Sequence, residues 1–213
     1  MDFIRARTPD QINSRQEEII NACDTLFTTY GYEGVTFKAI SDITTFTRPS
    51  IYNYYKTKDE ILLGLLGREM QAWQASFLEV MNSESSMSKE QYSAFLTRTL
   101  VTREKMLKLL SILFSVLEAN SRVEKYADFK RVSNVLDIIG ASLDKYFPEA
   151  SEEARTVFLS AFSAYILGLY PISHHTQKQL DAGQMAGIEH VVHVVPDLEY
   201  LCYHGILLLL SGL

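Results

Sequence analysis

The sequence contains few of the residues that interrupt regular secondary structure, with five prolines and ten glycines among 213 residues. Their scarcity excludes a low-complexity or disordered chain, which would be rich in both. The two cysteines, Cys23 and Cys202, lie far apart in sequence, which favours reduced, buried side chains over a disulfide framework. The longest aliphatic run, residues 206–210, is far shorter than the roughly 20 residues that span a bilayer, and residues 1–7 contain no apolar signal core. We therefore expect a cytoplasmic protein.

Signatures of catalysis and of metal binding are also missing from the sequence. It has neither a glycine-rich phosphate loop nor a nucleophile elbow. A helical di-metal oxidase would need Glu-x-x-His pairs, whereas Glu189 is followed directly by His190. The pairs His174–His175 and His190–His193 have no cysteine or glutamate cluster at ligand spacing. We expect no catalytic residues, no metal and no cofactor.

Hydrophobic periodicity predicts an all-α protein, because no stretch alternates like a strand over a useful length. Capping residues such as Ser14, Ser88, Ser151 and Asp197 mark helix starts, while Gly31, Pro148 and Pro171 mark ends or kinks. The predicted helices span residues 10 or 14–30, 36–43, 47–54, 58–81, 88–101, 103–119, 121–147, 151–170, 176–188 and 197–213. Residues 190–195 are expected to form a loop.

The charge of one segment differs from that of the whole chain, whose formal net charge is −6 at pH 7. Acidic proteins are poor partners for nucleic acids, because phosphates attract basic surfaces. Residues 36–58 reverse this balance, with four basic side chains and Asp42 as their single acidic one. A small basic face on an acidic body can bind DNA while the remainder suppresses non-specific association.

The pattern of residues 36–55 predicts two short helices joined by a tight turn. Thr36 and Thr47 are suited to cap these helices, and Pro49 is tolerated in the first turn of the second one. Phe46 falls in the turn and can plug the core between the helices. The residues expected to face inward are Ala39, Ile40, Ile43, Ile51 and Tyr55. This arrangement is typical of a helix-turn-helix, whose second helix enters the major groove of DNA.

The same segment resembles the TetR family of transcription regulators over roughly residues 14–66. The matching residues are Ile19, Ala22, Leu26, Phe27, Gly31, Tyr32, Val35, Thr36, Ile40, Phe46, Thr47, Ser50, Ile51, Tyr52, Tyr54, Tyr55, Lys58, Asp59 and Glu60. The family usually has glycine where Thr45 stands and alanine where Ser41 stands. Thr45 is therefore expected to adopt a left-handed or otherwise altered turn, at a cost on the order of 1 kcal/mol.

The resemblance implies an N-terminal three-helix DNA-binding domain, residues 1–58, joined by a long helix to a ligand-sensing and dimerisation domain, residues 59–213. Arg48 suits guanine and Asn53 suits adenine, while Pro49 suits a thymine methyl group. Lys58 should anchor a phosphate at the free N–H groups of a helix start, and Tyr52 suits either a base or the core. The other expected DNA contacts are Thr36, Ser50 and Tyr54 at phosphates, Lys38 at a base edge, and Thr47.

The second domain resembles the family in architecture only, so the ligand stays unidentified. Aromatic and apolar residues at helical spacing either fill the core or line a partly hollow pocket. The candidate pocket residues are Met70, Trp73, Phe77, Phe114, Leu117, Asn120, Phe129, Phe162, Tyr165, Tyr170 and His174. The apolar helices 151–170 and 197–213 are expected to form a dimer interface that includes Phe158, Phe162, Leu201 and Leu208.

Together these features predict a transcription regulator, a homodimeric repressor released from a palindromic operator by a small-molecule effector. The expected route runs along the fourth helix, from Lys58 near DNA to Met70, Trp73 and Phe77 near the effector. The alternatives are a helical small-molecule-binding protein or enzyme without DNA binding, and a structural adaptor. Sequence-selective DNA binding separates the regulator from all of these.

Overall fold

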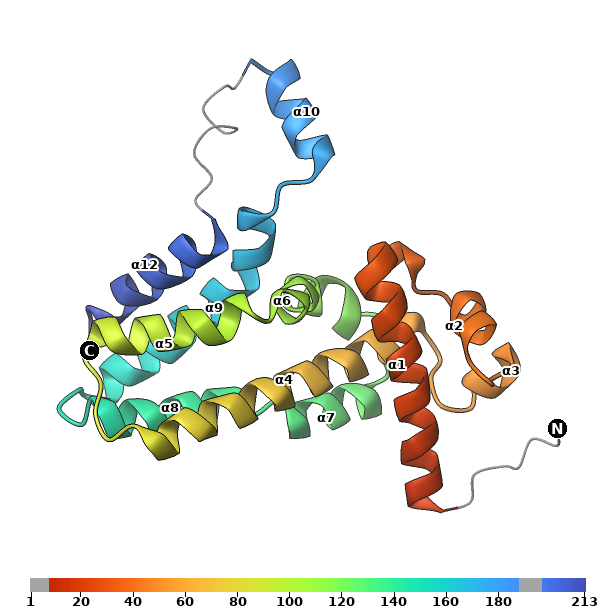
Figure 1. The fold of residues 1–213 in the computed structure, drawn as a ribbon, viewed down its shortest axis with the longest axis horizontal. Helices are drawn as coiled ribbons and strands as arrows, with labels where there is room; N and C mark the ends of the chain where they lie inside the picture. Colours follow the sequence, from red (N-terminus) through yellow and green to blue (C-terminus); the bar gives the residue numbers. More distant parts are fainter. Residues whose placement is uncertain (1–7, 188–196) are drawn as a thin grey trace. The chain divides into compact units, whose positions relative to one another are not determined.

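The computed structural model describes residues 8–187 and 197–213, and these residues form helices without strands (Figure 1). The all-α prediction is therefore confirmed. The helices are α1 (Pro9–Gly34), α2 (Phe37–Ile43), α3 (Arg48–Ile51), α4 (Lys58–Ser83), α5 (Lys89–Val101), α6 (Glu104–Leu110), the π-helix η1 (Leu113–Glu118), α7 (Val123–Val132), α8 (Val135–Tyr146), α9 (Glu152–Ser173), α10 (Gln177–Met185) and α12 (Leu198–Leu210). The loop expected at 190–195 lies outside the described residues.

Most helix boundaries follow the capping residues. Ser88, Ser151 and Asp197 each accept a hydrogen bond from a backbone N–H in the first turn, as expected. The first helix starts earlier than Ser14, because Thr8 forms a capping box with Gln11. Gly31 interrupts α1 at the expected place with a φ of 68°, a conformation that glycine adopts without strain.

Two of the predicted helices are wrong in length, because each is broken. The segment expected as one helix over 103–119 ends its α-helix at Leu110 and then rewinds as η1. The segment expected as one helix over 121–147 divides into α7 and α8. Between them, the Val135 amide donates to the Ser133 carbonyl, and the Asn134 side-chain amide donates to Asp137. Such local polar bonds compete with helix continuation, and apolar periodicity does not reveal them.

Backbone contacts divide the described chain into two compact units. The first unit contains Met1–Arg68 and Leu113–Val132, and the second contains Glu69–Ile112 and Ser133–Leu213. The helix α4 thus contributes to both units, and residues 113–132, here called the returning segment, belong with the N-terminal helices. A domain boundary after Lys58 stays a prediction.

The first unit has a core of aliphatic and aromatic side chains from α1 to α4. Ile19, Cys23, Ile40, Ile51 and Ile61 are all fully buried in it. Arg68 fastens α4 to α1, since its guanidinium donates to Asn21 Oδ1 at 2.5 Å and to Asp24 Oδ2 at 2.7 Å. Within this unit, α2 packs against α1 and α3.

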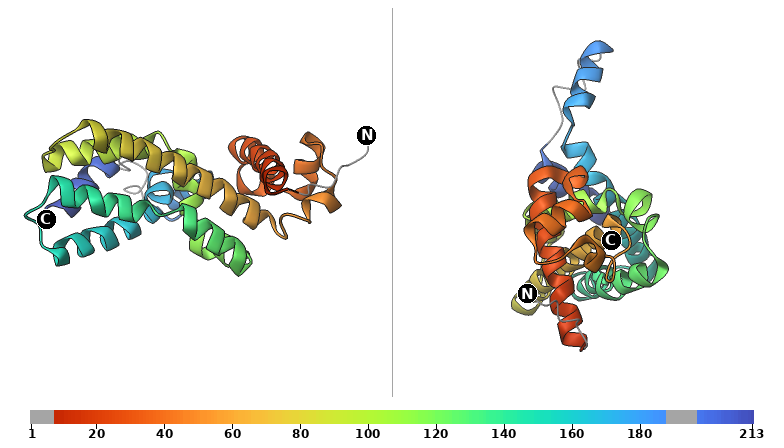
Figure 2. Two further views of the ribbon diagram at one scale, coloured as in Figure 1. Left: turned by 90° about the horizontal axis from the view of Figure 1, so that it is seen from below. Right: turned by 90° about the vertical axis from the view of Figure 1, so that its right-hand side faces the viewer.

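The second unit is a helical bundle in which α9 packs against α6, α8 and α12, and α12 also packs against α5. Figure 2 shows α8 and α9 running side by side. Trp73 is fully buried in this unit, and its indole N–H donates to Thr99 Oγ1 at 3.0 Å. Two hydrogen bonds, from Lys89 to the Leu213 carbonyl and from Ser93 to the Tyr203 carbonyl, tie α5 to the end of the chain.

The helix α9 is long and apolar enough to cross a membrane by length and composition alone, although the core helix of a soluble protein passes the same test. Pro171 lies within it, and the helix continues to Ser173. Much of its apolar surface is not buried inside its own unit. This surface is important for the quaternary structure proposed below.

Candidate DNA-binding helix-turn-helix

The helix α2 begins and packs largely as the sequence predicts. Thr36 caps it by accepting a hydrogen bond from the Ala39 amide at 3.0 Å, and Ile40 is fully buried. The expectation that Ile43 faces inward is wrong, since this side chain is 52% exposed. Ile43 is the last residue of α2, and it lines an open hollow beside α1 instead of entering the core.

The turn between α2 and α3 is held by a side chain from α1. Phe46 is buried in the turn, as predicted. The Thr45 amide and hydroxyl donate to Glu18 Oε1 at 3.2 and 2.8 Å. Of the two conformations expected at Thr45, left-handed or otherwise altered, the left-handed one is wrong, because positive φ among the described residues occurs only at Gly31 and Gly187. The turn is held by two hydrogen bonds to Glu18 and has no left-handed strain at Thr45.

The helix α3 is shorter than the predicted 47–54 and consists of one α-helical turn. Thr47 caps it and Pro49 occupies its first turn. Hydrogen bonds from the Tyr54 and Tyr55 amides to the Ile51 carbonyl continue the winding as turns. Ile51 and Tyr55 are buried, so this reading turn, residues 47–55, keeps the predicted inner face.

The sequence predicts that Ser50 faces solvent and contacts a phosphate, but the structure buries it. It is only 7% exposed, and its hydroxyl donates to the Thr47 carbonyl at 2.7 Å. This geometry leaves the donor occupied inside the reading turn, so Ser50 supports the cap and does not point at a phosphate. Tyr54 is half-buried and packs edge-on against Phe46, at 5.9 Å between ring centroids.

The outer face of the reading turn presents the residue types that suit DNA. Most of the predicted contacts are exposed there or on α2, namely Thr36, Lys38, Thr47, Arg48, Pro49, Tyr52 and Asn53. The Tyr52 ring packs edge-on against Phe37, at 4.5 Å between ring centroids. This contact supports the ring while part of the side chain stays exposed. Lys38 pairs with Asp42 at 2.7 Å on α2. Exposed ion pairs of this kind are weak, so phosphate can compete for Lys38.

Lys58 is more strongly engaged than a free surface lysine. Its ammonium donates to the Tyr32 carbonyl at 3.1 Å and lies 3.6 Å from the centre of the Tyr32 ring. The Tyr32 hydroxyl in turn donates to Asp59 at 2.7 Å. Burial, helped by this bond to Asp59, raises the pKa of Tyr32 above its usual range. Contact between Lys58 and a phosphate stays a prediction, and the ammonium can keep its bond to the Tyr32 carbonyl because it has three N–H donors.

The predicted effector-pocket residues do not all belong to one unit. Met70, Trp73, Phe77 and Phe162 are buried in the second unit, where the Tyr165 hydroxyl also donates to the Leu201 carbonyl. The others in this unit are Tyr170 and His174, whose rings stack at 4.3 Å. The remaining candidates, Phe114, Leu117, Asn120 and Phe129, belong to the returning segment of the first unit. Helical spacing indicated which residues share an apolar face of a helix, but it did not indicate which other helices that face packs against.

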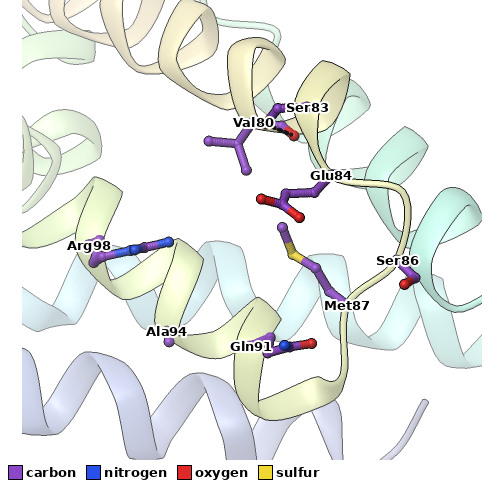
Figure 3. Close-up of a pocket in the computed structure, with 8 residues that line it drawn as sticks. All are labelled: Val80, Ser83, Glu84, Ser86, Met87, Gln91, Ala94 and Arg98. Carbon is purple, nitrogen blue, oxygen red and sulfur yellow. Dashed lines mark hydrogen bonds between the residues drawn. The ribbon is translucent and has the colours of Figure 1, made fainter.

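A pocket of about 400 Å³ lies elsewhere in the second unit, between the end of α4 and α5 (Figure 3). Its lining residues, none of which the sequence analysis selected, are Val80, Ser83, Glu84, Ser86, Met87, Gln91, Ala94 and Arg98. Figure 3 shows the Glu84, Met87 and Arg98 side chains pointing toward the middle of this pocket. Residues 83–86 of the sequence, Ser-Glu-Ser-Ser, interrupt the apolar pattern of the helix before them and are the signal that could have indicated an opening here.

The candidate dimer residues divide into two groups. Phe158 and Phe162 are buried and stack on each other at 5.7 Å, so the expectation that they face a partner is wrong. They lie on the face of α9 that covers its own unit. Leu208, in contrast, is 72% exposed on α12, and Leu201 is half-buried.

The histidines have neighbours that explain part of their environment. His174 Nε2 lies 3.3 Å from Glu104 Oε1, and its Nδ1 lies 2.9 Å from Ser173 Oγ. Among the residues described, no group of three or more histidine, cysteine or acidic side chains is arranged to hold a metal ion. His190 and His193 lie outside those residues.

Comparisons with known proteins agree with this geometry. No curated protein matches the chain. Among solved structures, the chain is similar to Thermus thermophilus FadR, a TetR-family transcriptional repressor in complex with lauroyl-CoA. The TM-score is 0.62 and the identity 16%, over 93% of this chain and 95% of that one.

Two further structures share the fold. A TetR/AcrR-family regulator from Thermobifida fusca has a TM-score of 0.59 at 19% identity, over 94% of this chain and 98% of that one. FadR from Bacillus subtilis, in complex with stearoyl-CoA, has a TM-score of 0.54 at 16% identity, over 92% and 98%. At these identities the likeness concerns the fold alone.

Two family models cover nearly the whole chain. The model of bacterial regulatory proteins of the tetR family matches residues 19–65, which contain the helix-turn-helix. A model of tetracyclin repressor-like C-terminal domains matches residues 67–213. With the capped, plugged helix-turn-helix of the first unit and the helical bundle of the second, these matches show that the chain belongs to the TetR family of bacterial transcription regulators.

Proposed function

We propose that this regulator represses transcription as a homodimer on a palindromic operator, and that a small molecule bound in its second unit releases it. Membership of the TetR family makes the chain a DNA-binding transcription regulator modulated by a small-molecule ligand. The observation that carries the proposal is the reading turn, which exposes Arg48, Pro49, Tyr52 and Asn53 on a buried support. It acts by binding and not by catalysis, in the cytoplasm, where the operator is.

Two observations support the dimer: one chain contacts too few base pairs, and it leaves apolar surface exposed. One reading turn contacts only a few base pairs, so useful specificity needs a second copy about one DNA turn away. The second observation concerns the outer faces of α9 and α12, where Val157 is 61% and Leu208 is 72% exposed. Apolar surface of this kind is stabilised by burial against an identical face.

For the effector we propose an acyl-coenzyme A thioester. The two FadR relatives named above were solved with lauroyl-CoA and stearoyl-CoA. In this chain, the pocket of Figure 3 combines apolar Val80, Met87 and Ala94 with the cationic Arg98. The apolar residues suit an acyl chain and Arg98 suits an anionic head group, provided that the acidic Glu84 of the same lining turns away from that group.

The proposal is tested in two steps on the full-length protein. Selection from random DNA duplexes should enrich a palindrome, and a mobility-shift assay should then show binding as a dimer. Lauroyl-CoA should release this complex, whereas free coenzyme A and dodecanoate should not. Enrichment of no sequence would refute the regulator, and tight binding of a monomer to one half-site would refute the dimer. Release by free coenzyme A alone, or no release, would refute the thioester.

Arg48→Ala and Lys58→Ala are expected to weaken operator binding in different ways. Loss of a base-reading Arg48 should cost about 1–3 kcal/mol at one operator position and relax the base preference there. Loss of Lys58 should weaken binding to all sequences and lower the salt slope by about one. Binding titrations on operator and scrambled duplexes at several salt concentrations measure both effects. Lys178→Ala, a charge removal on exposed α10, is the control, and equal losses on both duplexes for Arg48→Ala would contradict base reading.

A further inference from the structure

The first turn of α4 contains a buried acid, Glu60, that is only 1% exposed. Its two carboxylate oxygens accept four hydrogen bonds. Oε1 accepts from the Arg122 backbone amide at 3.2 Å and from Arg122 Nε at 2.6 Å. Oε2 accepts from Arg122 Nη2 at 2.9 Å and from the Lys56 amide at 2.6 Å. Glu60 thus joins Arg122 to the chain just after the reading turn.

The electrostatics of this cluster favour a charged Glu60. Burial alone raises the pKa of a carboxyl group. Here the bonds from Arg122 and from the Lys56 amide outweigh burial and hold the pKa of Glu60 below its usual range. Planar, two-point pairing of guanidinium with carboxylate is strong and directional, so the cluster fixes orientation as well as charge.

Arg122 comes from the returning segment, 62 residues away from Glu60 in sequence. The same segment makes further contacts along the start of α4. The Thr57 hydroxyl donates to the Asn120 carbonyl at 3.0 Å, and Lys125 lies 5.0 Å from the centre of the Tyr55 ring. The family model places this segment in the C-terminal domain, but its contacts belong to the DNA-binding unit.

The cluster leads directly to the exposed face of the reading turn. Glu60 holds the Lys56 amide, and the Lys56 ammonium donates to the Tyr52 carbonyl. Tyr52 and Asn53 are the last exposed residues of the predicted DNA contacts in the reading turn. Any rotation of the chain at Lys56 would therefore move Tyr52 and Asn53, two of the predicted DNA contacts.

We propose that Arg122 is a positioning residue for operator binding: through Glu60 and Lys56 it fixes the end of the reading turn without touching DNA. This inference rests on the operator binding proposed above. It adds a contribution from a segment outside the helix-turn-helix to sequence recognition. Because 43% of the Arg122 side chain is exposed, its removal lets water reach the cluster, and the fold is expected to survive.

A matched pair of variants separates positioning from charge. Arg122→Ala and Arg131→Ala each remove one positive charge from the returning segment, but the Arg131 side chain is exposed and pairs with Asp128, three residues away in the same helix. Operator and scrambled-duplex affinities are measured well below the unfolding temperature of each variant. Trp73 fluorescence, from the single tryptophan, reports on the second unit.

The expected result is a loss of about tenfold or more in operator affinity for Arg122→Ala, equivalent to at least about 1.4 kcal/mol. Its scrambled-duplex affinity should match that of Arg131→Ala, and Arg122→Lys should recover part of the loss. Amide exchange at residues 52–56 should accelerate in Arg122→Ala without DNA, while Trp73 fluorescence stays unchanged.

The outcomes separate this inference from the proposed function. If the wild-type protein enriches no operator, the proposed function fails before Arg122 is tested. If the wild-type protein binds its operator and Arg122→Ala binds as tightly as Arg131→Ala, the positioning role is wrong. If Arg122→Ala does not fold, the same comparison is made with Arg122→Lys, and unchanged operator affinity together with unchanged exchange at 52–56 overturns the inference.

Discussion

Replacing Leu208 with glutamate is expected to convert the homodimer into monomers and to lower operator affinity by at least about 100-fold. Leu208 is 72% exposed on α12, on the face proposed to meet a partner. A carboxylate buried there without a partner charge costs several kcal/mol. The loss of the second reading turn then removes half of the base contacts. Sedimentation measures the mass of the particle, and mobility shifts measure the operator affinity.

Two comparisons make this prediction sharp. Val157→Glu, on the outer face of α9, should have the same effect. Met185→Glu makes the same kind of apolar-to-acidic change at a position that is 89% exposed on α10, and it should leave the dimer intact. If both Leu208→Glu and Val157→Glu remain stable dimers, the interface lies on other helices.

Trp73→Ala is expected to lower the free energy of unfolding by about 3–5 kcal/mol. The side chain is fully buried, and its N–H is bonded to Thr99 Oγ1, so truncation removes packing and leaves a cavity. Trp73→Phe keeps much of the ring and should cost less, about 1–3 kcal/mol, from the lost hydrogen bond to Thr99 Oγ1 and the lost volume, while the Thr99 hydroxyl still donates to the Leu96 carbonyl. Urea unfolding followed by circular dichroism measures both, since the variants contain no tryptophan.

The Trp73 result also decides between two roles that the sequence left open. A residue that fills the core loses many contacts on truncation, whereas one that lines a hollow loses few. A cost below about 1 kcal/mol would contradict core filling and would favour Trp73 as a wall of the effector pocket. The full cost would direct the search for the effector to the pocket of Figure 3, near Arg98.

The caps of the helix-turn-helix and its buried residues Ile40, Phe46, Ile51 and Tyr55 could be predicted because their signals are local. A cap such as Thr36 or Thr47 acts on the amide three residues later. The buried pair Ile51 and Tyr55 follows from the helical repeat within one short segment. The family resemblance rests on the same residues, so the fold class and the DNA-binding unit were within reach of the sequence.

Errors arose where a residue's neighbour comes from elsewhere in the chain. The sequence could not show that Glu18 would hold Thr45 or that Lys58 would bind the Tyr32 carbonyl. The breaks after Leu110 and Val132 were equally hidden. The bonds to Glu18 and to the Tyr32 carbonyl become available only when the chain is folded, whereas the break after Val132 occurs with local polar bonds that apolar periodicity does not reveal.

The sequence by itself determined that the chain is helical, where its reading turn lies, and which side chains there suit DNA. Only the tertiary structure decided which apolar face is core and which is free. Phe158 and Phe162 cover their own unit, while Leu208 remains exposed. Only the tertiary structure brought Arg122 to Glu60 across 62 residues. The physical reason is that periodicity specifies a face of a helix, whereas the partner of that face depends on how distant helices pack.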